Sequence, residues 1–234
     1  MRYTRQELKQ DKLKETAAEA VHWSSEHRQN IVGVGIVLAV ILAAVVGGFW
    51  YYNYSSEHAT TALGLAMQIN DAPLAPKGAA GPQVTTFETV QERATAAKNA
   101  FYDVSSKYGS TRAGKFALYM AGVNEVTLGN NKAAEDNFKA VAKASDANVS
   151  ALAKFALASV YRETNRESDA VAIYKELIER PSDSVPKATA QFELAEVYSV
   201  KQPDEAKKIY AQMQKDNPKS AIGEVAGQRL SSMK

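Results

Sequence analysis

The chain has 234 residues and a nearly balanced charge, with 28 lysine and arginine against 26 aspartate and glutamate residues, and it has no cysteine. This balance lacks the basic excess of nucleic-acid-binding proteins, and the absence of cysteine excludes disulfide bonds and thiol catalysis. All three histidines precede residue 59, which excludes the usual zinc ligand sets and Cys/His nucleophile pairs from the rest of the chain.

The sequence also has neither the Walker nor the dinucleotide type of glycine-rich phosphate-binding motif. We therefore expect a protein that is not an enzyme and takes no cofactor, metal or small-molecule substrate. Its expected partners are other proteins, and no nucleic acid.

Residues 1–29 are predicted to form a helical N-terminal segment. Thr4 and Glu7 have the T-x-x-E spacing of a capping box at a helix start. A thin apolar stripe follows, from Leu8 to Val21. Whether this stripe lies on a membrane or meets a partner is left open.

Residues 30–54 are predicted to be a transmembrane helix. Every residue from 31 to 50 is apolar or glycine, and no charge occurs between Arg28 and Glu57. A helix of about 20 apolar residues spans the hydrocarbon core of a bilayer, whereas the apolar part of a signal peptide has only about 7–15 residues. Aromatic residues at 49–52 and 54 close the run, as they do at membrane interfaces. The segment is therefore expected to stay as an anchor.

The basic residues predict the orientation of this anchor. Six lysine or arginine residues precede it, and the first one after it is Lys77. Because basic residues flanking a span remain on the cytoplasmic side, we expect a single-pass protein of the inner (cytoplasmic) membrane. Its N-terminus should be cytoplasmic and its C-terminal part periplasmic. A cytoplasmic repeat domain would require this orientation to be wrong.

Small residues recur every fourth position within the span, at Gly35, Ala39, Ala43 and Gly47. Such a stripe lets a second helix approach closely in lipid. Glycine and alanine are also common in membrane helices, so the stripe is a hypothetical helix-packing face.

Residues 55–110 are expected to form a degenerate first helical hairpin, in which Ala97 and Phe101 repeat a pattern found further on. The loop at 70–87 contains three prolines and two glycines. It is too long for a simple hairpin turn, so it is either a mobile functional loop or disordered.

Residues 111–218 contain three repeats of about 36 residues, and a final capping helix is expected within 219–234. Alanines at 134, 170 and 206 and aromatic residues at 138, 174 and 210 each recur at intervals of 36. Small residues at 122, 158 and 195 mark the first helix of each unit. The residues expected to pack the repeats are Gly122, Ala134, Phe138, Ala158, Ala170, Tyr174, Ala195, Ala206 and Tyr210.

At these positions the chain resembles the tetratricopeptide repeat family, whose unit is a helix–turn–helix of about 34 residues. The second unit departs from the pattern, with Glu125 where an aromatic is usual and Val141 where a small residue is usual. The resemblance implies an all-α solenoid of helical hairpins that binds other proteins.

The order of the parts adds a second resemblance. A short N-terminal segment, one span, a degenerate hairpin and the opening KYGSTRAGKFALYMAG at residues 107–122 resemble the bacterial YfgM-like family. Members of that family are ancillary subunits of the SecYEG translocon, with a periplasmic repeat domain linked to periplasmic chaperones. The resemblance implies a membrane-anchored adaptor in protein translocation and chaperoning. The alternative is a scaffold subunit of another membrane or cell-envelope complex.

Tyr119, Phe155 and Phe192 are the predicted partner-binding residues. Each lies three positions before the small residue of a first helix, and by resemblance this place faces the groove of the solenoid. Aromatic side chains there would offer a large contact area to an extended peptide. The alternative is that the three rings pack between helices as part of the core.

Overall fold

The computed structural model describes residues 28–76 and 85–233, and these residues form an all-α structure, as predicted. The expected N-terminal segment 1–29 lies almost entirely outside the described residues, as do residues 77–84 of the expected loop. In the described part of that loop, Leu74 and Phe87 form an isolated backbone bridge.

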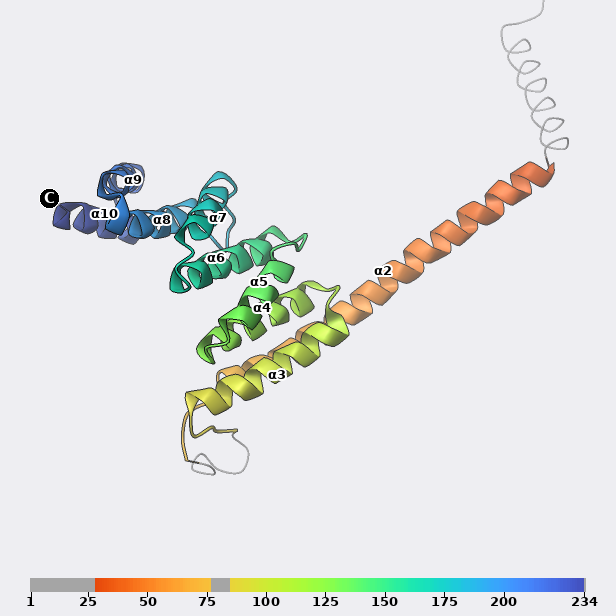
Figure 1. The fold of residues 1–234 in the computed structure, drawn as a ribbon. Coiled ribbons are helices and arrows are strands. Elements are labelled where there is room, and N and C mark those ends of the chain that lie inside the picture. The colour runs from red at the N-terminus through yellow and green to blue at the C-terminus, as the bar shows by residue number, and fades with distance from the viewer. Residues whose placement is uncertain (1–27, 77–84, 234) are drawn as a thin grey trace, which may run out of the picture. The chain divides into compact units, whose positions relative to one another are not determined.

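The helices carry the labels of Figure 1. They are α2 (Arg28–Asn70), α3 (Val90–Tyr108), α4 (Arg112–Thr127), α5 (Asn131–Val141), α6 (Ala147–Glu163), α7 (Glu167–Glu179), α8 (Lys187–Lys201), α9 (Pro203–Asp216) and α10 (Ala221–Ser232).

The first part of α2 is the apolar segment, and it belongs to a compact unit that ends at Tyr54. Its large apolar side chains are exposed, for example Leu42 at 65% and Trp50 at 68%. Among the described helices, α2 alone is long and apolar enough to cross a membrane by length and composition. These side chains are therefore largely exposed within the described chain, although Trp50 stacks on Tyr54.

The second compact unit begins at Ser55 and consists of helical hairpins. The C-terminal part of α2 packs with α3 and α4 around Ala66, Ala97 and Phe101. The pairs α4–α5, α6–α7 and α8–α9 follow, and α10 packs on α9. From yellow α3 to blue α10 in Figure 1, each hairpin contacts the next one along the chain. Nearest-neighbour packing of this kind defines a solenoid.

Local chemistry explains the helix ends. Four helices begin with a side chain that accepts a hydrogen bond from the N–H three residues later, which satisfies an otherwise unpaired donor. These caps are Thr89, Thr111, Asp146 and Ser220. In the hairpin turns, Gly129 (φ 77°) and Asn165 (φ 59°) adopt the left-handed conformation, which glycine and asparagine adopt most readily. Pro203 is the first residue of α9, where its missing N–H costs no helical hydrogen bond.

The repeated small and aromatic residues lie in the interior. The buried set comprises Gly122, Ala134, Phe138, Ala158, Ala170, Tyr174, Ala195, Ala206 and Tyr210. The α4–α5 crossing shows why a small residue stands there, because a Cβ atom on Gly122 would lie 2.6 Å from Cε1 of Phe138. Close approach of the two helices leaves no room for a larger side chain.

Candidate partner-binding surface

Three half-buried rings follow one another along the first helices of the repeats. Tyr119 lies on α4, Phe155 on α6 and Phe192 on α8. Each ring contacts a buried ring of the following helix, with centroid distances of 5.8 Å, 5.8 Å and 5.9 Å in chain order. One side of each ring therefore packs on the core and part of it stays accessible. We call the side of α4, α6 and α8 that carries these rings the aromatic face.

A pocket of about 480 Å³ lies one helical turn further along the aromatic face. Ser159 follows Phe155 by one turn and Glu196 follows Phe192 by one turn, so both lie on that face. The pocket, which we call the α6–α8 pocket, is lined by Ser159, Arg162, Glu163, Glu167, Glu196, Val197 and Val200.

Ion pairs surround the α6–α8 pocket. Arg162 pairs with Glu193, which does not line the pocket. Two of the lining carboxylates have exposed cationic partners, at 2.7 Å from Lys201 to Glu167 and at 3.1 Å from Arg229 to Glu196. Sequence reasoning missed this pocket because its residues come from three helices with no shared motif. The one available signal was a pair of glutamates, at 163 and 196, near the ends of equivalent helices.

A second pocket, of about 360 Å³, lies between α2, α4 and α6. Leu63, Phe116 and Leu152 contribute its apolar walls, and Ser56 and Arg112 are among its polar lining residues. Phe116 also contacts Tyr119 at 5.6 Å between ring centroids. The accessible aromatic area thus extends toward the start of α4.

A buried carboxylate marks the junction of α3, α4 and α5. Glu125 is 5% exposed and stands where later repeats have a tyrosine. It accepts hydrogen bonds from the Tyr102 hydroxyl at 3.1 Å and the Asn130 amide at 2.7 Å, and the Lys98 ammonium lies 3.7 Å away. Asn137 donates in turn to the Tyr102 hydroxyl oxygen. The departure from the repeat pattern is therefore compensated by a satisfied polar network.

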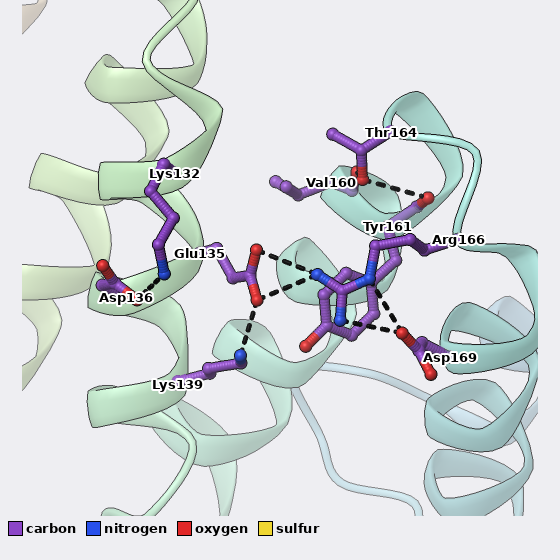
Figure 2. Close-up of polar contacts among 9 residues, drawn as sticks. All are labelled: Lys132, Glu135, Asp136, Lys139, Val160, Tyr161, Thr164, Arg166 and Asp169. Atoms are coloured by element: carbon purple, nitrogen blue, oxygen red, sulfur yellow. Dashed lines mark hydrogen bonds and ion pairs between the residues drawn. The ribbon is translucent and has the colours of Figure 1, made fainter.

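Figure 2 shows a second polar network, which links α5 to α6 and α7. Arg166 donates to both carboxylate oxygens of Glu135, at 3.0 and 3.1 Å, and to Asp169 at 2.9 Å. Its guanidinium carbon lies 4.0 Å from the ring centroid of Tyr161, a cation–π geometry. The hydrogen bond from Lys139, together with those from Arg166, holds the pKa of Glu135 below its ordinary 4.5.

Equivalent tyrosines beneath the aromatic face differ in their hydroxyl surroundings. Tyr210 donates a hydrogen bond to Glu196, and burial, together with that carboxylate, raises the pKa of Tyr210. The Tyr174 hydroxyl is buried without a partner at hydrogen-bond geometry. Its polar neighbours are Arg162 and Ser159, and burial raises the pKa of Tyr174 as well.

The small-residue stripe of the apolar segment lies on the exposed surface of α2. A Cβ atom on Gly35 or Gly47 would meet no atom within 4 Å. Ala39 and Ala43 are exposed as well. Across residues 28–76 and 85–233, no three His, Cys, Asp or Glu side chains are placed to hold a metal ion.

Stacked helical hairpins with small residues at their crossings define a helical-repeat protein. The chain matches the family model of the tetratricopeptide repeat-like domain over residues 22–176 and that of the tetratricopeptide repeat over residues 189–220. The first match covers more than half of the chain, which therefore belongs to the tetratricopeptide repeat-like domain family. Comparisons with curated proteins and with solved structures gave no match. Repeats of this family indicate a role in protein–protein interaction.

Proposed function

We propose that the protein is a membrane-anchored adaptor whose repeat domain binds other proteins on the exported side of the membrane. The observation that carries this proposal is the pairing, in one chain, of an apolar helix with exposed side chains and a domain of interaction repeats. The helix supplies membrane attachment, and the aromatic face supplies accessible ring surface for a partner. The proposed topology is a single span with a cytoplasmic N-terminus.

The resemblance to YfgM-like proteins makes the SecYEG translocon and periplasmic chaperones the first partners to test. In this proposal the stripe of Gly35, Ala39, Ala43 and Gly47 faces a helix of the membrane complex. Close contact between small residues is favourable in lipid, where backbone proximity strengthens van der Waals packing. A scaffold role in another envelope complex would use the same anchor and domain with different partners.

The absence of cysteine allows a direct test of topology. Single cysteines are introduced by Ser24→Cys before the apolar segment and Ser232→Cys near the C-terminus. Intact cells are then treated with a membrane-impermeant maleimide. Labelling of Ser232→Cys alone supports the proposal, once the outer membrane has been made permeable. Labelling of Ser24→Cys alone would show that the topology is the opposite of the one proposed.

Partner identity is tested by crosslinking in cells, extraction in mild detergent and mass spectrometry of what remains bound to a C-terminally tagged chain. Recovery of translocon subunits and periplasmic chaperones supports the specific proposal. Replacing Gly35 and Gly47 with leucine should then reduce translocon recovery, whereas Val34→Leu is a matched control elsewhere on the helix. Recovery of a different complex, without the translocon, would reject the specific partner and retain the adaptor role.

A further inference from the structure

The α6–α8 pocket combines an apolar surface with carboxylates from three helices. Val200 is 81% exposed, the highest value among the exposed large apolar side chains of the described residues, and it lines the pocket beside Val197. Glu163 comes from α6, Glu167 from α7 and Glu196 from α8. A long basic side chain has both matching parts, since its methylene stem packs on apolar surface while its charged end reaches polar groups.

Three helix ends lie at the α6–α8 pocket. Ser159, Arg162 and Glu163 lie in the last turns of α6, and Val197 and Val200 lie in the last turns of α8. The C-terminal end of a helix carries a partial negative charge from its unpaired carbonyl groups. Two such ends meet at this pocket together with the N-terminal end of α7, which begins at Glu167 and carries the opposite partial charge. The preference for a cation therefore rests on the side chains.

The cationic side chains at the α6–α8 pocket are few, and two of them lie outside its lining. Arg162 is the only lysine or arginine among the residues that line the pocket. The side chains of Lys201 and Arg229 are 67% and 54% exposed, and they pair with Glu167 and Glu196 from outside the lining. Exposed ion pairs of this kind contribute little, so an incoming cation can compete for the same carboxylates.

A buried hydroxyl without a partner lies beside the pocket. Tyr174 is fully buried, and its hydroxyl neighbours are Ser159 and Arg162, both of which line the pocket. A buried polar atom without a hydrogen bond is destabilising. In the next repeat, the equivalent Tyr210 has Glu196 as its partner. The polar groups nearest to the Tyr174 hydroxyl are thus residues of the pocket, although Tyr174 itself does not line it.

We propose that the α6–α8 pocket binds a lysine or arginine side chain of an extended segment in a partner protein. The stem of that side chain packs on Val197 and Val200, and its charge is held among Glu163, Glu167 and Glu196. Aromatic rings one turn earlier on the same face contact the neighbouring part of the segment. This inference rests on the proposed adaptor function and specifies what the adaptor recognises.

The test uses the full chain in detergent and an array of short synthetic peptides. Each peptide has one fixed central residue, which is Lys, Arg, Gln or Glu, and flanks of randomised neutral residues. We expect the Lys and Arg peptides to bind about five-fold more strongly than the Gln peptides, with the Glu peptides weakest. Equal binding of all four sets, or no binding, overturns the inference.

Matched variants locate the binding. Glu163→Gln and Val200→Ser alter exposed residues of the pocket, and each should lower binding of the Lys and Arg peptides about three-fold or more. The control is Glu179→Gln, which removes an exposed carboxylate from a separate pocket between α7, α8 and α9. If the control loses as much binding as Glu163→Gln, the inference is wrong.

A third measurement separates this inference from the proposed function. The crosslinking experiment is repeated with Glu163→Gln and Glu179→Gln chains of equal thermal stability. Loss of partner recovery with Glu163→Gln alone supports the pocket. Full recovery with both variants rejects the pocket and retains the adaptor function. Absence of any specific partner with the unmodified chain rejects the adaptor function itself and the inference that rests on it.

Discussion

Tyr174 and Tyr210 hold the same place in consecutive repeats, four residues after the alanine of the second helix, and both rings are fully buried. The repeat pattern identified both as packing residues. The pattern cannot show that the two hydroxyl groups have different hydrogen-bond surroundings, since these surroundings depend on residues from the preceding helix. Ser159 stands where the next repeat has Glu196, which accepts a hydrogen bond from Tyr210, and the Tyr174 hydroxyl has no partner at hydrogen-bond geometry.

Removing the two hydroxyls should therefore have unequal effects. Tyr210→Phe removes the donor to Glu196 and should lower the free energy of unfolding by about 1–2 kcal/mol. Tyr174→Phe removes a buried hydroxyl without a partner and should leave stability unchanged or slightly higher. Urea denaturation of the two variants side by side measures the difference. Equal losses would mean that Tyr174 has a partner in solution.

Gly122 gives a second prediction at this scale. Gly122→Ala places a methyl group 2.6 Å from the ring of Phe138, and we expect a loss of about 1–3 kcal/mol from overpacking. Gly64→Ala is the matched control, because Gly64 is an exposed helical glycine with no atom within 4 Å of a Cβ position. It should be neutral or gain up to about 1 kcal/mol in helix propensity. Equal stability of the two variants contradicts the packing described for α4 and α5.

At the scale of elements, the helices themselves were predictable because apolar spacing, turn residues and capping side chains all lie within short stretches of sequence. Contacts between hairpins were less predictable from the sequence. The repeat spacing marked Glu125 as an exception to the pattern. Only the structure shows that Tyr102 of α3 and Asn130 at the start of α5 donate hydrogen bonds to it. The bond between Arg166 and Glu135 had no signal in the sequence, since these two residues lie 31 positions apart.

The link between α5 and α7 predicts a specific response to acid. The pKa of Glu135 is lowered in the folded state, so its stabilising contribution is present above the unfolded pKa and is lost as pH falls through the lower folded pKa. Glu135→Gln should therefore be less stable than the unmodified chain at neutral pH, and the gap should close in acid. Urea titrations from about pH 7 to about pH 3 measure this convergence.

Asp136→Asn is the control for that experiment. Among the residues that the structure describes, Asp136 pairs only with Lys132 of the same helix, and both side chains are largely exposed. Exposed pairs contribute little, so this variant should follow the unmodified chain closely across the same pH range. A constant gap between Glu135→Gln and the unmodified chain at every pH would show that Glu135 does not have a lowered pKa.

At the scale of the whole molecule, the sequence predicted a repeat solenoid and an apolar N-terminal helix, and both are found. Repetition made this possible, because a pattern that occurs three times at a constant spacing identifies a stack that no single hairpin would reveal. The sequence identified the three rings of the aromatic face, but it could not predict how far each ring is exposed. The half-buried rings of Tyr119, Phe155 and Phe192 each pack on a ring from the second helix of the same hairpin.

The retained anchor is tested by the intact mass of the protein extracted from membranes. We expect a mass that includes residues 31–50, since the apolar run is longer than that of a signal peptide and ends in aromatic residues. The protein should also resist extraction at alkaline pH. A mature chain that begins after residue 50 would identify the apolar segment as a cleaved signal and remove the basis for the stripe hypothesis.

The buried Glu125 has a consequence for how the chain assembles. Hairpins that resemble one another can dock in the wrong order, because each offers its neighbours nearly the same surface. Glu125 makes the first junction different, since Tyr102 and Lys98 of α3 meet its carboxylate there. A hairpin docked elsewhere would keep the hydrogen bond from Asn130 but would bury this charge without Tyr102 and Lys98, at a cost in free energy. The irregular residue Glu125 thus favours docking of the α4–α5 hairpin on α3 over docking of the same hairpin at another position in the stack.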